Sequence, residues 1–133
     1  QPFIPKENAL NAFADILRVS HYYEQPNYLT VFKRHRPDDF LLSYGVDGFS
    51  MAMDFRITPD NQQKMLKLTR ELDEIVLAAN GRFYFAKDST VRPEVAQAYL
   101  GEEAINRFRT LKTRCDPDNL LQTNLWRRVF GAA

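Results

Sequence analysis

Residues 49–57, FSMAMDFRI, constrain the fold more than any other stretch, because large apolar side chains occupy every second position. Side chains of an extended strand point alternately to its two faces, so this run predicts a strand with one apolar face. The apolar face would carry Phe49, Met51, Met53, Phe55 and Ile57. The opposite face would carry Ser50, Ala52, Asp54 and Arg56.

Helices are predicted before and after that strand. Residues 7–19 and 61–80 repeat apolar side chains at the three- and four-residue spacing of a helix with one buried stripe. In residues 7–19 the stripe consists of Leu10, Phe13, Ile16 and Leu17. For the second helix, Asp60 and Gln63 predict a capping box at the start, and Gly81 predicts the stop.

Further strands are expected at residues 1–4, 28–36 and 82–86, which are rich in strand-forming side chains. The order strand, helix, strand, strand, helix, strand predicts an α+β fold. It is the ferredoxin-like βαββαβ pattern, an antiparallel sheet with both helices on one face. Helical segments at residues 93–99, 102–113 and 125–130 follow. We therefore expect a domain over residues 1–90 and a C-terminal helical segment over residues 91–133.

Composition excludes several classes of function. The chain has 133 residues, of which 44% are hydrophobic, and its net charge is +1. That length suits a single folded domain, and so small a net charge offers no strong attraction for nucleic acid. RNA-recognition modules also need stacking aromatic side chains on the helix-free face, where this chain offers Ser50 and Ala52. No nucleic-acid partner is therefore expected.

Metal and membrane sites are not expected either. The single cysteine, Cys115, excludes an intramolecular disulfide and a Cys-based zinc site, and we interpret it as a structural thiol. Two histidines are too few for a His-rich metal site. No apolar run is long enough for a transmembrane segment. We expect a cytoplasmic location, with peripheral membrane association left open, and the start at Gln1 suggests a fragment of a longer protein.

The helix-free face of the sheet carries the polar candidates. In residues 28–36 alternation places Lys33 and His35 on one face, together with apolar side chains. Small side chains at Ser50 and Ala52 leave room above the neighbouring strand. Because both sheet faces are partly apolar, we expect a missing domain or a flat ligand to cover the helix-free one.

Three charged groups can each be interpreted as a site or as solvated surface. The run from Lys33 to Arg36 is either a phosphate-binding patch or a solvated strand end. We favour the solvated strand end, because charged side chains are rarely buried without a partner. Lys87 and Asp88, directly after the last strand, belong either to a site or to a solvent-exposed turn. The arginines of WRRVF are either a phosphate-binding patch or the surface of a terminal helix, and the second is favoured.

Several segments together resemble a known family. MAMDFRI, the helix after it, GRFYFAKDS and DPDNLLQTNLWRRV are similar to the C-terminal part of FAD-linked oxidases of the vanillyl-alcohol-oxidase type. The likeness extends from QPFIP to RRV, and sugar-lactone oxidases are more distant relatives with a similar tail. It implies that residues 1–90 form the substrate-binding cap domain. Residues 91–133 would return toward an N-terminal FAD-binding domain, which is absent from this chain and would be its partner.

The resemblance assigns roles to individual residues. Lys87 matches a lysine that reaches flavin and substrate, and Tyr84 matches a tyrosine near the flavin. Lys33 and Gln1 match a lysine and a glutamine of the substrate pocket. These roles would make Tyr84 and Lys87 cofactor-binding and make Gln1, Lys33 and Lys87 substrate-binding.

Three further substrate-binding positions depart from a close member of the family. Ser50 stands where that member has a pocket Asn, Ala52 where it has a reactive Cys, and His35 where it has a Phe. Covalent trapping at Ala52 is therefore not expected. Asn124 replaces an Asp of the terminal motif. These changes leave the exact substrate open.

The activity implied by the resemblance is oxidation of a sugar or sugar-derivative alcohol by hydride transfer to FAD. The catalytic base is not identified. Because the FAD-binding domain is absent, we expect this chain alone to be inactive and to bind FAD weakly or not at all. The alternative is a freestanding ferredoxin-like module that binds a small ligand or regulates, without catalysis.

Overall fold

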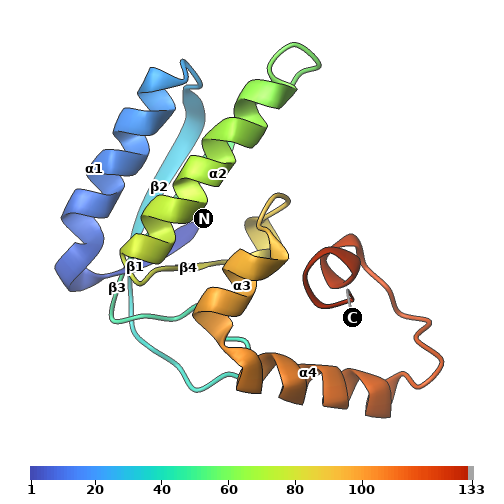
Figure 1. Ribbon diagram of the computed structural model, residues 1–133. Coiled ribbons are helices and arrows are strands. Elements are labelled where there is room, and N and C mark those ends of the chain that lie inside the picture. The colour runs from blue at the N-terminus through green and yellow to red at the C-terminus, as the bar shows by residue number, and fades with distance from the viewer. Residues whose placement is uncertain (132–133) are drawn as a thin grey trace.

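The computed structural model, which describes residues 1–131, contains a four-stranded antiparallel sheet (Figure 1). The strands are β1 (Pro2–Pro5), β2 (Asn27–His35), β3 (Gly48–Phe55) and β4 (Arg82–Phe83), in the spatial order β2-β3-β1-β4. Helix α1 (Lys6–Tyr22) joins β1 to β2, and helix α2 (Gln62–Ala78) joins β3 to β4. The predicted α+β, ferredoxin-like order is confirmed.

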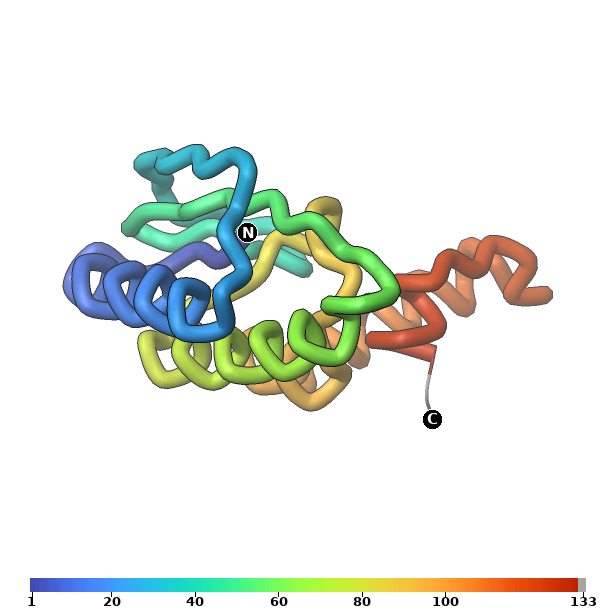
Figure 2. The backbone as a smooth tube through the Cα atoms, turned by 90° about the horizontal axis from the view of Figure 1, so that it is seen from above, coloured from blue at the N-terminus to red at the C-terminus, as the bar shows by residue number. Residues whose placement is uncertain are grey.

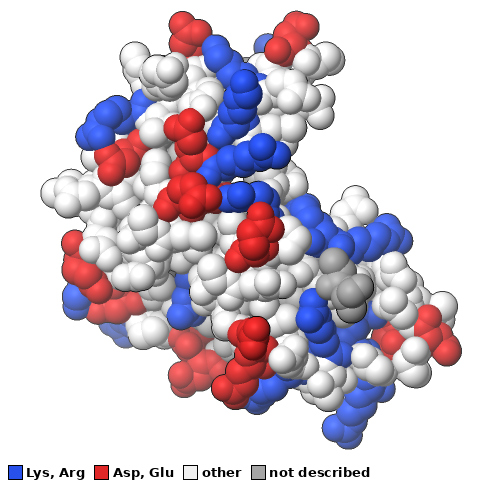
Figure 3. Space-filling model, viewed as in Figure 1, with Lys and Arg blue, Asp and Glu red and all other residues white. Residues whose placement is uncertain are grey.

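Both helices lie on one face of the sheet, and the main core lies between these two layers (Figure 2). Ile4 from β1 and Met51 from β3 meet Ile16 from α1 and Leu68 and Val76 from α2 in one buried cluster. Burial of such side chains stabilises the fold by roughly 1.5–3 kcal/mol each. Acidic and basic side chains intermingle on the outer surface of these helices (Figure 3).

The apolar stripe predicted for α1 is only half correct. Phe13 and Ile16 are buried, but Leu10 is 83% exposed and Leu17 is 46% exposed. Together with Phe32 of β2 they line a shallow apolar groove beside the edge of the sheet. The predicted stripe is wider than the surface that α1 buries. Helix α1 packs against α2, β1 and β3, and Leu10 and Leu17 lie outside these contacts.

The last strand is shorter than predicted. β4 ends at Phe83, and Phe85–Lys87 form a 3-10 turn instead of continuing the strand to residue 86. Phe83 pairs with Pro2, and the Tyr84 N–H donates to the Gln1 carbonyl at 3.1 Å. The strand conformation ends where the 3-10 turn begins, with the Lys87 N–H donating to the Tyr84 carbonyl.

The termini of α2 also differ from the prediction. The capping box is wrong, because the residue before the helix is Asn61 and no side chain caps it. The Asn61 side chain instead accepts from the Thr58 N–H and donates to the Arg56 carbonyl. At the other end the left-handed residue is Asn80, with φ of 54°. Gly81 is needed for packing, since a Cβ there would lie 2.6 Å from Ile4 Cδ1.

The C-terminal segment contains α3 (Pro93–Leu100), α4 (Glu102–Cys115) and a π-helical turn at Trp126–Phe130. Helix α3 packs on α2 and contacts the π-helical turn, whereas α4 extends away from the sheet (Figure 1). The turn returns to the sheet domain, where Phe130 contacts Phe85. Cys115 is exposed at the end of α4, so its interpretation as a structural thiol is wrong.

Candidate functional site

Strand register places the predicted polar residues on the helix-free face. Ser50 pairs with Phe3 on one side and with Lys33 on the other, and Ala52 pairs with Val31. Directly paired residues of antiparallel strands point to the same face. Since Met51, the residue between Ser50 and Ala52, packs against the helices, all of these side chains point away from them.

Three of the predicted residues form a hydrogen-bonded chain across three strands. Gln1 Nε2 donates to Ser50 Oγ at 3.0 Å, and Ser50 Oγ lies 2.8 Å from His35 Nε2. Ser50 is fully buried at 0% exposure, and Ala52 is 5% exposed. The room predicted above these small side chains is therefore absent, because Gln1 and His35 fill it at Ser50.

An aromatic cluster covers the middle of the same face. Phe3 is only 1% exposed although it points away from the helices. Its ring centroid lies 4.5 Å from His35, 4.8 Å from Tyr44 and 6.4 Å from Tyr84. Part of the cover that was expected from a missing domain or ligand is thus supplied by the chain itself, through residues 36–47.

Tyr44 is a member of this aromatic cluster that was not among the residues predicted from the sequence. The signal was present in LLSY, residues 41–44, which is too apolar for a solvent-exposed turn. The segment is anchored by Arg82, whose guanidinium donates to the Ser43 carbonyl at 3.0 Å. Tyr44 then packs edge-on against Tyr84, with ring centroids 4.6 Å apart. Tyr84, predicted to lie near the flavin, therefore belongs to this aromatic cluster.

The two residues after β4 have different environments. The Asp88 carboxylate accepts from the N–H groups of Thr90 and Val91 and pairs with the Arg128 guanidinium at 2.9 Å. Asp88 thus stabilises the turn after β4, and its ion pair with Arg128 connects the C-terminal π-helical turn to the sheet domain. Arg128, expected on the surface, is held in this pair.

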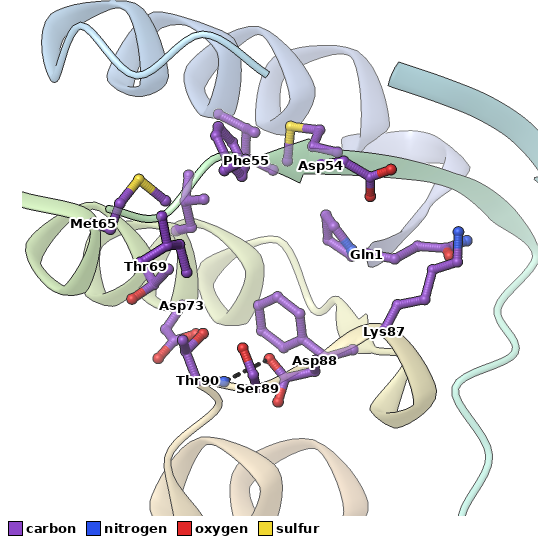
Figure 4. A pocket seen from close by; sticks show the side chains of 16 residues that line it. Gln1, Asp54, Phe55, Met65, Thr69, Asp73, Lys87, Asp88, Ser89 and Thr90 are labelled. Carbon is purple, nitrogen blue, oxygen red and sulfur yellow. Dashed lines mark hydrogen bonds between the residues drawn. The ribbon is translucent and has the colours of Figure 1, made fainter. Parts of the chain in front are cut away.

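Lys87 is exposed, and no side-chain hydrogen bond or ion pair within residues 1–131 holds its ammonium group. Its side chain extends toward that of Gln1, and both residues line the mouth of a cavity (Figure 4). An ammonium group kept at the rim without a counter-ion is free to meet an anion.

The basic residues after Phe32 also differ in their environments, since Arg34 has side-chain partners and Lys33 has none among residues 1–131. The Arg34 guanidinium pairs with the Asp47 carboxylate, donates to the Gly48 carbonyl and lies over the Phe49 ring. Lys33 is exposed and has no side-chain partner in the described part of the chain. Arg34 therefore supports the solvated-strand-end interpretation, while Lys33 remains available on the helix-free face.

The cavity of about 250 Å³ lies between the end of β3, helix α2 and residues 87–90 (Figure 4). Its buried polar group is Asp73, whose carboxylate pairs with the Arg92 guanidinium at 3.1 Å. Burial raises the pKa of Asp73 to about 6, although Arg92 acts in the opposite direction. This acid was not predicted, because in the sequence it is one of several acidic residues on α2.

No group of three or more His, Cys, Asp or Glu side chains within residues 1–131 is arranged to hold a metal ion. Across the same residues, no helix combines the length and apolar character that crossing a membrane requires.

Known proteins are similar to this chain, among them the following two. Over 124 residues, or 92% of the chain, it is 30% identical to the decaprenylphosphoryl-beta-D-ribose oxidase of Mycolicibacterium smegmatis, and the match covers 25% of that protein. The chain matches part of an FAD-linked oxidase. The resemblance drawn from the sequence, within that family to decaprenylphosphoryl-ribose oxidases, is thereby confirmed.

The second relative is an uncharacterized protein of Streptomyces coelicolor, described by its position in the mprA 5' region. It is 34% identical over 88 residues, which are 66% of this chain and 23% of that protein. No protein-family model matches the chain. The chain spans about a quarter of the length of each of these two relatives.

Proposed function

We propose that this chain is the C-terminal, substrate-binding part of an FAD-dependent oxidoreductase that oxidises a sugar or sugar-derivative alcohol. The observation that carries the proposal is the helix-free face, where Gln1, Ser50 and His35 form one hydrogen-bonded chain beside the unpaired Lys33. The similarity to an oxidase supports it, because it covers nearly all of this chain.

The side chains on this face suit a polar, hydroxyl-bearing molecule. Gln1 and His35 offer hydrogen-bond groups at a partly exposed surface, and Ala52 keeps the adjacent position small. Lys33 and Lys87 bring positive charge that stabilises an anion on the substrate or on a reduced flavin. FAD, when bound, supplies the hydride acceptor. Two residues of this chain suit a bound flavin. Lys87 has an ammonium group without a partner in residues 1–131, and Tyr84, three residues earlier, has an aromatic ring.

The rest of such an enzyme would come from an FAD-binding domain of the same protein. No Gly-rich phosphate-binding loop is present in this sequence, so the pyrophosphate of FAD needs that domain. We accordingly propose that residues 1–90 are the cap, that residues 91–133 return to the FAD-binding domain, and that this chain alone is inactive. A cytoplasmic location remains a prediction.

The alternative, a freestanding module without catalysis, is not favoured. Its support was the ferredoxin-like topology, which many unrelated functions share. The match to one contiguous part of an oxidase points instead to a piece of a larger catalytic protein.

The test is anaerobic flavin reduction by the complete protein. We expect the purified protein to be yellow and its flavin absorbance to be bleached by a sugar or sugar-derivative alcohol. The 133-residue chain, purified in the same way, should carry no flavin. A complete protein that binds no FAD, or a stoichiometrically yellow chain, would refute the proposal.

A further inference from the structure

The buried Ser50 hydroxyl defines the protonation of its neighbour. Ser50 Oγ accepts a hydrogen bond from Gln1 Nε2, so its own proton needs an acceptor elsewhere. The acceptor within reach among the described residues is His35 Nε2, at 2.8 Å. Leaving a buried hydroxyl proton unsatisfied is unfavourable. His35 Nε2 is therefore the unprotonated nitrogen, and the ring proton lies on Nδ1.

The surroundings of His35 favour the neutral ring. A charged imidazolium would donate from both nitrogens and leave the Ser50 proton without an acceptor. Burial, and then the positive charges of Lys33 and Arg34, hold the pKa of His35 below its ordinary value. The Phe3 ring packs against the imidazole with centroids 4.5 Å apart and adds no polar group.

The other ring nitrogen is uncommitted. No residue among 1–131 accepts a hydrogen bond from His35 Nδ1, and the His35 side chain is only partly buried. An N–H donor without a partner in the described residues therefore lies on the same face as Lys33.

We propose that Ser50 is a positioning residue that holds His35 in its Nδ1–H tautomer, and that His35 thereby selects substrates that present an acceptor oxygen to this face. The oxygen would be a hydroxyl or ether oxygen of a sugar-like molecule. The selectivity rests on the proposed function, whereas the tautomer follows from the hydrogen bonds of this chain alone.

The first experiment measures the tautomer by two-dimensional 1H–15N spectroscopy of the complete protein labelled with 15N-histidine. The His35 signals are assigned by their loss in His35→Asn. We expect protonated Nδ1 and unprotonated Nε2 at neutral pH. In Ser50→Ala the preference should be lost, whereas Ser20→Ala, which removes a buried hydroxyl bonded to the Ile16 carbonyl, should not change it. A protonated Nε2 in the parent protein, or the same tautomer in Ser50→Ala, overturns the proposal.

The second experiment measures kcat/KM with a sugar alcohol and with its deoxy analogues. His35→Phe removes the donor and should lower kcat/KM about 10- to 100-fold, mainly through KM, for substrates that retain the acceptor oxygen. For the matching deoxy analogue the loss should disappear. His35→Asn keeps a donor and should recover most of the activity. Equal losses for both substrates contradict the selectivity.

Flavin content separates the two possible failures. If the parent protein holds no FAD, the proposed function and the selectivity fail together, while the tautomer measurement still decides the role of Ser50. If the parent protein is active and His35→Phe discriminates between substrates as the parent does, only the selectivity of His35 fails.

Discussion

The two faces of the sheet are equally well buried at their centres but are held by different forces. On the helix-covered face Ile4 and Met51 pack against carbon atoms of α1 and α2. On the helix-free face Phe3 and Ser50 are as deeply buried, but hydrogen bonds and ring contacts hold them in place. Burial alone therefore does not distinguish core from site. The second face depends on directional contacts, so small chemical changes there should alter function more than stability.

The largest effect on stability is expected on the helix-covered face. Leu68 of α2 is fully buried, so Leu68→Ala should lower the free energy of unfolding by about 2–5 kcal/mol through lost contacts and a cavity. Urea denaturation of the chain measures it. The control is Leu66→Ala on the same helix, where the side chain is 39% exposed and the loss should be much smaller. Equal losses would show that α2 does not bury the face that carries Leu68.

On the helix-free side, the effect of a substitution at Lys87 is expected in the activity of the complete protein. Lys87→Met in the complete protein keeps most of the side-chain length and removes the charge. We expect near-normal folding and a loss of about 2–4 kcal/mol in transition-state stabilisation, which is roughly a 30- to 1,000-fold lower rate. Lys67→Met, an exposed change on α2, is the control and should be neutral. Normal flavin content and normal reduction kinetics in Lys87→Met would make Lys87 an ordinary surface lysine.

Ser50→Ala should have an intermediate effect on stability. The change leaves the Gln1 amide and the His35 ring without their shared partner, at an expected cost of about 1–3 kcal/mol in the free energy of unfolding. Chemical denaturation of the parent and variant chains is the measurement. An unchanged denaturation midpoint would mean that the hydrogen-bonded chain contributes nothing to the fold.

The smallest effect is expected from Asp73, the buried acid on the helix-covered side. Its pKa is raised to about 6 in the folded chain, above the ordinary value of about 4 in the unfolded chain. The folded state thus binds the proton more tightly, so the contribution of Asp73 to stability is present below pH 4 and is lost as pH rises through 6.

Asp73→Asn removes this titration. Relative to the parent chain, the variant should be similarly stable near pH 4 and should gain about 1 kcal/mol by pH 7.5, reduced by solvent in the adjoining cavity. Thermal or urea unfolding at both pH values checks this. A stability difference that does not change with pH would place the Asp73 pKa at its ordinary value.

The amino-acid sequence determined the order of the elements and the face of each strand residue. The alternation in residues 49–57 places Met51 and Ser50 on opposite faces of the sheet, because successive side chains of a strand point to opposite sides. This holds whichever position the strand takes in the sheet. The same rule places the side chains of Lys33 and His35 on one face of their strand. The resemblance to an oxidase also needed no coordinates, since it is carried by contiguous residues.

Tertiary structure decided what those residues touch. Tyr44 reaches Phe3 from 41 positions away in the chain, and Asp88 meets Arg128 from 40 positions away, and no local pattern encodes such contacts. The sequence also showed Leu10 as a core residue, but the packing of α1 leaves it in solvent. Periodicity reports which way a side chain points, whereas its burial and its hydrogen-bond partners depend on which distant segment packs above it.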